Sequence, residues 1–301
     1  MELIQRSAEH YFLTTLEKRK TDASHWYGLY FSLSKALKHH DLVSDLSKLS
    51  QKIQTAKAKS DVLAEEVYNA LKDQFEGSVC VFADTDIFVF VKAEDKMKKK
   101  ILDEVFKNIA KKLPSGFSDM DGIGNQFRSY MKLADENLLS AKRMDAYEHM
   151  TDENKVASIS ARRKRRDDPV VLVVEDDRFT AHYASNILSG DFDFVLSRDG
   201  EDAVQTYIEH APDIVFLDIH LPGLTGHEVL QSINAVDPKA FVVMLSVDSV
   251  QDNIVRASQM GARKFLKKPF TKERLIETVK NSPYVRELTR SDRAGSETLL
   301  H

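Results

Sequence analysis

The second half of the chain alternates between short apolar runs and amphipathic segments, and this alternation limits the possible folds more than any other feature. The apolar runs are continuous, as in parallel strands that are buried on both faces. They lie at residues 170–174, 194–196, 213–218, 241–245 and 263–266. Strands that alternate with helices form a parallel sheet with helices on both faces. We therefore predict a doubly wound α/β domain of five parallel strands over residues 169–283.

Charged or hydroxyl side chains stand at the ends of four of these predicted strands. They are Glu175 and Asp176, Asp218, Ser246, and Lys268. The carboxyl ends of parallel strands border the crevice in which open α/β sheets bind ligands. Three carboxylates in one crevice repel one another unless a cation neutralises them, and oxygen ligands at a site open to water suit Mg²⁺. The pattern therefore predicts a Mg²⁺ site.

The same set of side chains suits the transfer of a phosphoryl group. An aspartate that acts as a nucleophile forms an aspartyl phosphate. The charge of the transferred group then needs a cation, which Lys268 would supply, and a hydroxyl donor, which Ser246 would supply. Pro269 follows the lysine, and because X–Pro bonds adopt the cis form more readily than other peptide bonds, we expect a cis bond there.

Four segments of this half resemble the receiver domain of two-component response regulators. They read VLVVEDD at 171–177, DIVFLDIHLPGLTG at 213–226, VVMLS at 242–246 and KFLKKPF at 264–270. The resemblance extends over residues 169–282. It implies a flavodoxin-like sheet with the strand order 2-1-3-4-5.

The resemblance also implies which residues would accept the phosphoryl group and hold the metal. Asp218 would be the phosphoacceptor, and it would bind the Mg²⁺ ion together with Asp176. Glu175 would act on the ion through water. The backbone carbonyl of His220 would be the third protein ligand.

Three further residues receive roles from the same resemblance. Ser246 and Lys268 would bind the phosphoryl group and so complete the catalytic set. Phe265 stands at the aromatic switch position, which turns inward when the hydroxyl residue moves. This movement would alter the face formed by the domain's fourth helix, fifth strand and fifth helix, and would thereby shift an equilibrium between two states.

The first half of the chain mixes helical and strand patterns, which is typical of a helix-rich α+β domain over residues 1–150. In chain order, the patterns predict a helix at 1–20, a strand at 26–34, helices at 36–56 and 61–75, a hairpin of strands 79–83 and 87–91, a helix at 95–112, a loop at 115–125 and a helix at 126–149.

The order of elements over residues 25–112 resembles the GGDEF diguanylate cyclase and nucleotide cyclase fold. The turn at 83–86 lacks the two glycines of that family, and residues 32–34 lack its first metal carboxylate. Two-metal nucleotidyl transfer needs carboxylates from both places. We therefore interpret the first half as a non-catalytic module for sensing, dimerisation or partner binding, with Asp84 and Asp86 as turn residues. A nucleotide or diguanylate cyclase gated by the receiver is the alternative.

The two halves are joined by a polar segment at residues 151–168 that shows no apolar periodicity, and we interpret it as a solvated basic linker. It contains a run of five basic residues, 162–166. Such a run could contact nucleic-acid phosphates, with an affinity that falls steeply with salt. Because no DNA-reading motif adjoins it and acidic residues follow at once, we expect no nucleic-acid binding.

Composition excludes several classes of protein. The formal net charge of −4 gives no general attraction to nucleic acids or anionic membranes, and no apolar run approaches the 18 or so residues of a membrane span. The single cysteine, Cys80, excludes an intramolecular disulfide and suits a reducing compartment. The N-terminus lacks the features of a secretory signal. We expect a cytoplasmic protein without membrane contact.

Together these observations predict a response regulator, and not an enzyme, that accepts a phosphoryl group from a histidine kinase or a histidine phosphotransfer protein. The polar tail at 284–301 is too short for an output domain. We therefore expect the output to pass through the first half, through a homodimer or through a downstream protein partner. A receiver fold that serves as a scaffold and is never phosphorylated is a further alternative.

Overall fold

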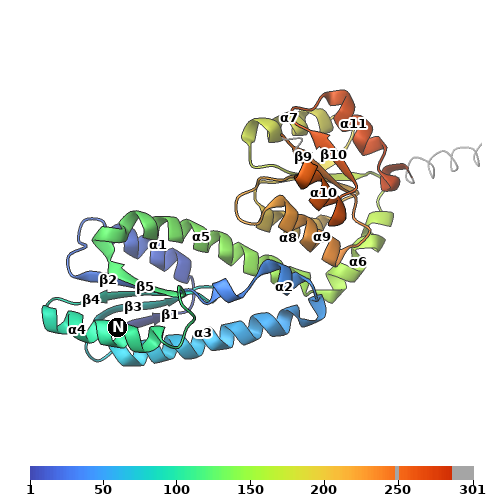
Figure 1. The fold of residues 1–301 in the computed structure, drawn as a ribbon. Helices are drawn as coiled ribbons and strands as arrows, with labels where there is room; N and C mark the ends of the chain where they lie inside the picture. Colours follow the sequence, from blue (N-terminus) through green and yellow to red (C-terminus); the bar gives the residue numbers. More distant parts are fainter. Residues whose placement is uncertain (248–250, 287–301) are drawn as a thin grey trace, which may run out of the picture. The chain divides into compact units, whose positions relative to one another are not determined.

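The computed structural model describes residues 1–247 and 251–286, which form two compact units with one five-stranded sheet each (Figure 1). The N-terminal unit comprises Met1–Leu42 and Lys48–Asp145, and the C-terminal unit comprises Val43–Ser47 and the chain from Ala146 onward. Of the predicted polar tail, only residues 284–286 are among those described. Within the described residues, no helix is both long and apolar enough to cross a membrane.

The sheet of the C-terminal unit is parallel throughout, which confirms the predicted fold class. Its strands are β6 (Val170–Val174), β7 (Asp193–Ser197), β8 (Ile214–Asp218), β9 (Val242–Ser246) and β10 (Lys264–Lys267). The order β10-β9-β8-β6-β7 is 2-1-3-4-5 when these five strands are numbered along the chain. The two central strands β8 and β9 are buried at every position, which explains why their sequences are continuously apolar.

Five helices connect and cover these strands. They are α7 (Arg178–Leu188), α8 (Gly200–His210), α9 (Gly226–Val236), α10 (Gln251–Gln259) and α11 (Lys272–Lys280). Four of them begin at a residue whose side chain accepts a hydrogen bond from the first turn, and these capping residues are Asp177, Asp199, Thr225 and Thr271. Such caps satisfy free backbone N–H groups, so they fix where each helix begins beyond its strand.

The segment predicted to be a solvated linker is instead largely helical. Helix α6 (Glu153–Lys164) packs against α8. Arg162 donates hydrogen bonds to the backbone carbonyls of Ile208 and Glu209 at 2.5 and 2.6 Å, and Arg166 donates to the two carbonyls that follow. These carbonyls lie at the end of α8, where a helix has unpaired acceptors and a partial negative charge. The basic run therefore caps a helix, a role that apolar periodicity could not reveal.

A third arginine of this run is buried. Arg163 donates to the backbone carbonyl of Pro212 at 3.0 Å, to the Tyr207 hydroxyl at 3.0 Å and to the Asp237 carboxylate at 2.9 Å. Its guanidinium also stacks over the Tyr284 ring, 4.4 Å from the ring centroid. Because a buried charge is costly unless it is paired and hydrogen-bonded, this set of partners makes α6 part of the C-terminal unit.

The N-terminal unit contains a mixed sheet of the order β1-β3-β4-β2-β5. Its strands are β1 (Glu2–Ile4), β2 (Trp26–Phe31), β3 (Glu76–Val81), β4 (Ile87–Lys92) and β5 (Ser118–Gly122). Strand β1 is parallel to β3, and all other neighbours are antiparallel. With their connecting helices, β2 to β5 form the split β-α-β-β-α-β arrangement. The predicted hairpin is confirmed as β3 and β4.

The helices of this unit are α1 (Ala8–Arg19), α2 (His39–Val43), α3 (Leu49–Leu71), α4 (Lys96–Ala110) and α5 (Ile123–Met150), with short 3-10 turns at Ser34–Ala36 and Leu46–Lys48. Apolar side chains pack on both faces of the sheet. Four predictions were wrong in detail. The single helix predicted at 36–56 is instead the short helix α2, a 3-10 turn and the start of α3. Strand β1 lies within the predicted first helix, β5 replaces a predicted loop, and α3 continues through the break predicted between two helices. Both missed strands are short and are held by backbone bonds to β3 and β2, so they need no apolar alternation of their own.

Candidate functional site

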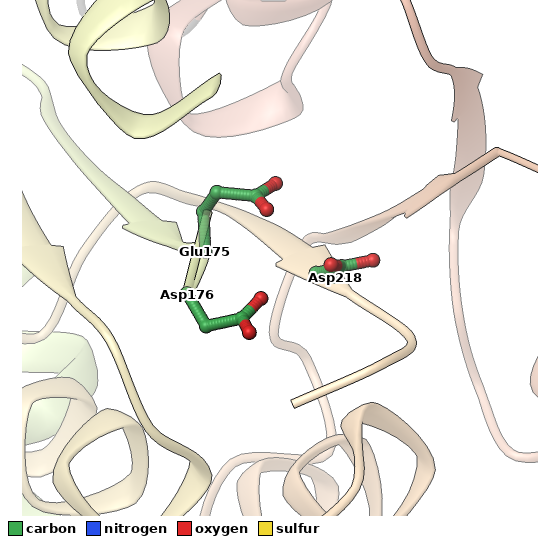
Figure 2. Close-up of side chains that lie close together, drawn as sticks. All are labelled: Glu175, Asp176 and Asp218. Atoms are coloured by element: carbon green, nitrogen blue, oxygen red, sulfur yellow. The ribbon is translucent and has the colours of Figure 1, made fainter. Parts of the chain in front are cut away.

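Three carboxylates from two neighbouring strand ends face one another in the C-terminal unit. Glu175 and Asp176 directly follow β6, and Asp218 is the last residue of β8 (Figure 2). Because β6 and β8 are paired in parallel, with Val174 opposite Leu217, both strands end at the same edge of the sheet. One oxygen from each carboxylate lies within 4.8 Å of the others. Within the described residues, this is the only group of three or more acidic, His or Cys side chains close enough to share an ion.

The three carboxylates differ in their access to solvent. Glu175 is fully buried and Asp218 is 6% exposed, whereas Asp176 is exposed. They line a pocket of about 660 Å³ together with His220, Lys268 and side chains of α7. An ion at this place would have buried ligands on one side and water on the other, which is the arrangement that Mg²⁺ favours.

Lys268 brings a positive charge to the buried side of the cluster. Its Nζ atom lies 2.8 Å from Oδ2 of Asp218 and 2.5 Å from Oε2 of Glu175. The lysine follows β10, and its backbone N–H donates to the carbonyl of Ser246 at 2.8 Å. The Lys268–Pro269 peptide bond is cis, as predicted. Strands β9 and β10 therefore position the amine of Lys268 beside the acids at the ends of β6 and β8.

Burial and charge change the proton affinities of this cluster. Burial raises the pKa of Glu175 to about 7, with a further increase from the Asp218 charge and an opposing effect of Lys268. Burial alone would lower the pKa of Lys268, but its hydrogen bonds to Asp218 and Glu175 outweigh this effect and raise it. The amine is therefore charged at neutral pH and offers a permanent cation to any anion that enters.

The remaining predicted residues border this arrangement. Ser246 is the last residue of β9 and lies one position beyond Leu245, the register partner of Asp218. Phe265 is half-buried on β10, opposite Met244. His220 is exposed and lines the pocket through its position in the loop after β8. Six of the seven predicted residues therefore lie at the edge of the sheet where the strands end. The seventh, Phe265, lies within β10, which is the strand that precedes Lys268.

Sequence reasoning missed a buried glutamate that holds the loop after Asp218. Both carboxylate oxygens of Glu201, on α8, accept from the backbone N–H of Leu224 at 3.1 Å. The neighbouring Gly223 has a φ of 74°, and a Cβ atom there would lie 2.1 Å from the Glu201 carboxylate. The Pro-Gly pair in the sequence indicated a turn, but no local pattern could indicate its partner on α8.

Sequence reasoning also missed apolar side chains at the mouth of the pocket. Phe179 on α7 is 87% exposed, and Val247 after β9 is 56% exposed. Phe179 follows the capping residue of α7 by two positions, outside the stripe of the helix that faces the core. An apolar residue outside such a stripe was the available sequence signal, because exposed apolar groups often mark contact surfaces.

The acidic turn of the first half is buried rather than solvated. Asp86 accepts hydrogen bonds from the hydroxyls of Tyr30 and Ser32 and from the backbone N–H of Ser34. Asp84 accepts from the backbone N–H of Asp86 at 3.0 Å. Burial, and then the Asp86 charge, raise the pKa of Asp84 to about 7. Asp86 therefore ties the hairpin to the end of β2, and Asp84 supports the turn itself.

Comparison with known protein sequences assigns the C-terminal unit to the receiver domains. The family model described as "Response regulator receiver domain" matches residues 171–280. The chain is similar to the chemotaxis protein CheY of Listeria monocytogenes, with 39% identity over 114 residues that cover 37% of this chain and 96% of the relative. It is 33% identical over 111 residues to the regulatory protein LuxO of Vibrio cholerae, covering 37% of this chain and 24% of LuxO. Among solved structures, the receiver domain of NtrX from Brucella abortus is 33% identical, with a TM-score of 0.36, and the match covers 37% of this chain and 96% of that one.

Proposed function

The chain belongs to the response regulator receiver family through its C-terminal unit, and on this premise we propose that Asp218 accepts a phosphoryl group in a Mg²⁺-dependent reaction. The observation that carries this proposal is the Asp218 carboxylate at the edge of an open pocket, 2.8 Å from the Lys268 amine and close to two further acids. The family membership supports a role in two-component signalling.

The donor set fits Mg²⁺ because its ligands are oxygen atoms, one of which is exposed to water. Asp176, Asp218 and the backbone carbonyl of His220 would hold the ion, and Glu175 would act through water. The bound ion would neutralise the carboxylates and the oxygens of the incoming phosphoryl group.

The protein's own side chains perform the rest of the reaction. An oxygen of Asp218 forms a bond to phosphorus while the bond from phosphorus to the donor's imidazole nitrogen breaks. The Lys268 amine, already within 2.8 Å of Asp218, then binds an oxygen of the new phosphoryl group, and the Ser246 hydroxyl donates to another. A histidine kinase or a histidine phosphotransfer protein would supply the group, and exposed Phe179 at the pocket mouth offers it an apolar contact.

The phosphorylated state would act through the face formed by α10, β10 and α11. Movement of Ser246 toward the phosphoryl group would let half-buried Phe265 turn inward. This face would then favour a second copy of the chain or a downstream protein partner. The N-terminal unit would serve in sensing or partner binding, and the protein would act as a regulator rather than an enzyme. The buried Cys80 suits the reducing cytoplasm, where we propose that the protein works.

Phosphate uptake from radiolabelled acetyl phosphate tests this proposal. The wild-type chain should take up label in the presence of Mg²⁺, and Asp218→Asn should abolish uptake because the nucleophile is lost. The matched control is Asp193→Asn, which changes an exposed aspartate at the start of the edge strand β7, at the opposite edge of the sheet from Asp218. Uptake that survives in Asp218→Asn would show that the acceptor is another residue. A wild-type chain that takes up no label would favour the scaffold alternative.

A further inference from the structure

The N-terminal unit contains a second pocket, which the proposed function does not use. Its volume is about 580 Å³, within the range of sites for small molecules. The walls come from three segments: the turn and short helix after β2, the first half of α3, and the turn before β5. All of these residues belong to the N-terminal unit.

The inner wall of this pocket is apolar. It is formed by Leu33, Leu37, Leu42, Leu113 and Phe117. Leu42 is buried, and the other four are half-buried, so each still presents hydrocarbon surface to the pocket. Water in contact with such a wall is released when an apolar group replaces it, which favours a ligand with a hydrocarbon body.

The outer wall of the pocket is cationic. Lys38, Lys48, Lys52 and Lys59 all line it, against one carboxylate, that of Asp41. Three of these lysines are exposed, and Lys52 is half-buried and donates to the backbone carbonyl of Asp41. This local excess of positive charge contrasts with the formal charge of −4 for the whole chain. Ammonium groups at the mouth of an apolar pocket would attract and bind an anionic head group.

We propose that this pocket binds a small amphipathic anion, whose hydrocarbon body contacts the leucine-rich wall and whose carboxylate or phosphate head contacts the lysines. A fatty acid is the simplest molecule of this class. A nucleotide fits less well, because the hydrogen-bonding edges of its base would face leucine and phenylalanine side chains and lose their partners. A concave pocket of this size also suits a single molecule better than the plane of a membrane.

Binding of decanoate to the full-length protein tests the proposal by titration calorimetry. We expect saturable binding of one decanoate, with roughly tenfold weaker binding of the uncharged 1-decanol, because the alcohol lacks the charge that the lysines recognise. We expect no binding of GTP. The proposal is overturned if decanoate does not bind saturably, if 1-decanol binds equally well, or if GTP binds and displaces decanoate.

Two pairs of charge reversals locate the site. The double variant Lys38→Glu with Lys59→Glu should weaken decanoate binding by about tenfold or more and leave 1-decanol binding unchanged. The matched control, Lys96→Glu with Lys100→Glu, changes two exposed lysines of α4 outside the pocket and should bind decanoate as the wild type does. Equal affinities of the two double variants for decanoate would contradict the assignment of the head-group site.

A separate measurement distinguishes a free ligand from a membrane lipid. Vesicles of phosphatidylglycerol are sedimented with the protein, with phosphatidylcholine vesicles as the control. The proposal predicts no sedimentation with either, because the head group and hydrocarbon of one molecule must both enter the pocket. Sedimentation with phosphatidylglycerol that the Lys38 and Lys59 reversals abolish would show that the lysines recognise a membrane surface and would overturn the proposal of a free ligand.

Discussion

The two units of this protein each contain a buried acid with a pKa of about 7, but they surround it differently. In the C-terminal unit, Glu175 shares the Lys268 amine with Asp218 at the edge of an open pocket. In the N-terminal unit, Asp84 is buried within a hairpin turn beside Asp86, whose partners are hydroxyl and backbone N–H groups. A raised pKa is therefore not enough to identify a reactive site.

The difference lies in the cation and in the access to solvent. An amine beside a carboxylate can bind a second anion, so the C-terminal cluster can stabilise a transferred phosphoryl group. The hydroxyl groups that donate to Asp86 fix the geometry of a turn. They are uncharged, so they supply no cation that could bind a second anion. The C-terminal unit contains another carboxylate that is paired with a cation, because the Arg163 guanidinium lies 2.9 Å from the Asp237 carboxylate.

The largest expected effect is the loss of stability when Arg163 is removed. Arg163→Ala leaves Asp237, whose side chain is 12% exposed, without its guanidinium partner. Breaking a buried ion pair costs roughly 3–5 kcal/mol, so the free energy of unfolding of the C-terminal unit should fall by that amount. Denaturant unfolding followed by circular dichroism measures it, with exposed Arg165→Ala as the matched control. A loss below about 1 kcal/mol would show that α6 is not part of this unit's core.

Removal of Lys268 sharpens the comparison at the proposed phosphorylation site. Lys268→Ala deletes the cation but keeps all three carboxylates, so phosphate uptake should fall by about 10²–10³-fold while Mg²⁺ still binds. Rates of uptake from acetyl phosphate and calorimetric titration with Mg²⁺ separate the two effects. The neighbouring Lys267→Ala, which changes an exposed lysine, should leave both unchanged. Wild-type uptake in Lys268→Ala would show that the neighbouring cation is not what sets the Glu175 cluster apart from Asp84.

The acid of the N-terminal unit should make that unit sensitive to pH. The pKa of Asp84 is about 7 in the folded state and near its usual value of 3.8 when unfolded, so the folded state holds the extra proton between these values. Stability should therefore fall as the pH rises from about 4 to 8, on the order of 2 kcal/mol. The sole tryptophan, Trp26, is buried in this unit, so its fluorescence during denaturant unfolding reports the change. Asp84→Asn should flatten the dependence, and an unchanged slope in this variant would contradict the role of Asp84.

The smallest effect is expected for the glutamate that holds the loop after Asp218. Glu201→Gln weakens the charge-assisted bonds to the Leu224 N–H without opening a cavity, so phosphate uptake should slow by roughly threefold to tenfold. The adjacent Asp202→Asn, on the same helix, should have no effect. Equal rates in both variants would show that the loop keeps its position without Glu201.

The C-terminal unit was largely predictable because its signals are local. Continuous apolar runs mark strands such as β8, and the acids and the lysine that stand at the ends of β6, β8 and β10 lie at the same edge by the geometry of a parallel sheet. The meeting of Lys268 with Asp218 follows from strand order, which the resemblance to receiver domains supplied. The chemical roles of these residues stay predictions until phosphate uptake is measured.

The parts that could not be predicted depend on partners distant in the sequence. Strand β5 has the polar sequence SDMDG and is a strand because its backbone pairs with β2. Arg162 and Arg163 at the end of α6, and Arg166 just beyond it, donate to backbone carbonyls more than forty residues away. Asp84 and Asp86 belong to a residue type that is common in exposed turns, and their burial depends on residues distant in the sequence, such as Tyr30 and Ser32, whose hydroxyls donate to Asp86.

Identification of the phosphorylated residue tests the central claim most directly. After incubation with acetyl phosphate and Mg²⁺, borohydride reduction converts an aspartyl phosphate into a stable alcohol, and peptide mass spectrometry locates the converted residue. We predict conversion at Asp218 alone, and none when the Mg²⁺ is chelated beforehand. Conversion at another carboxylate, or none in the presence of Mg²⁺, would contradict the account.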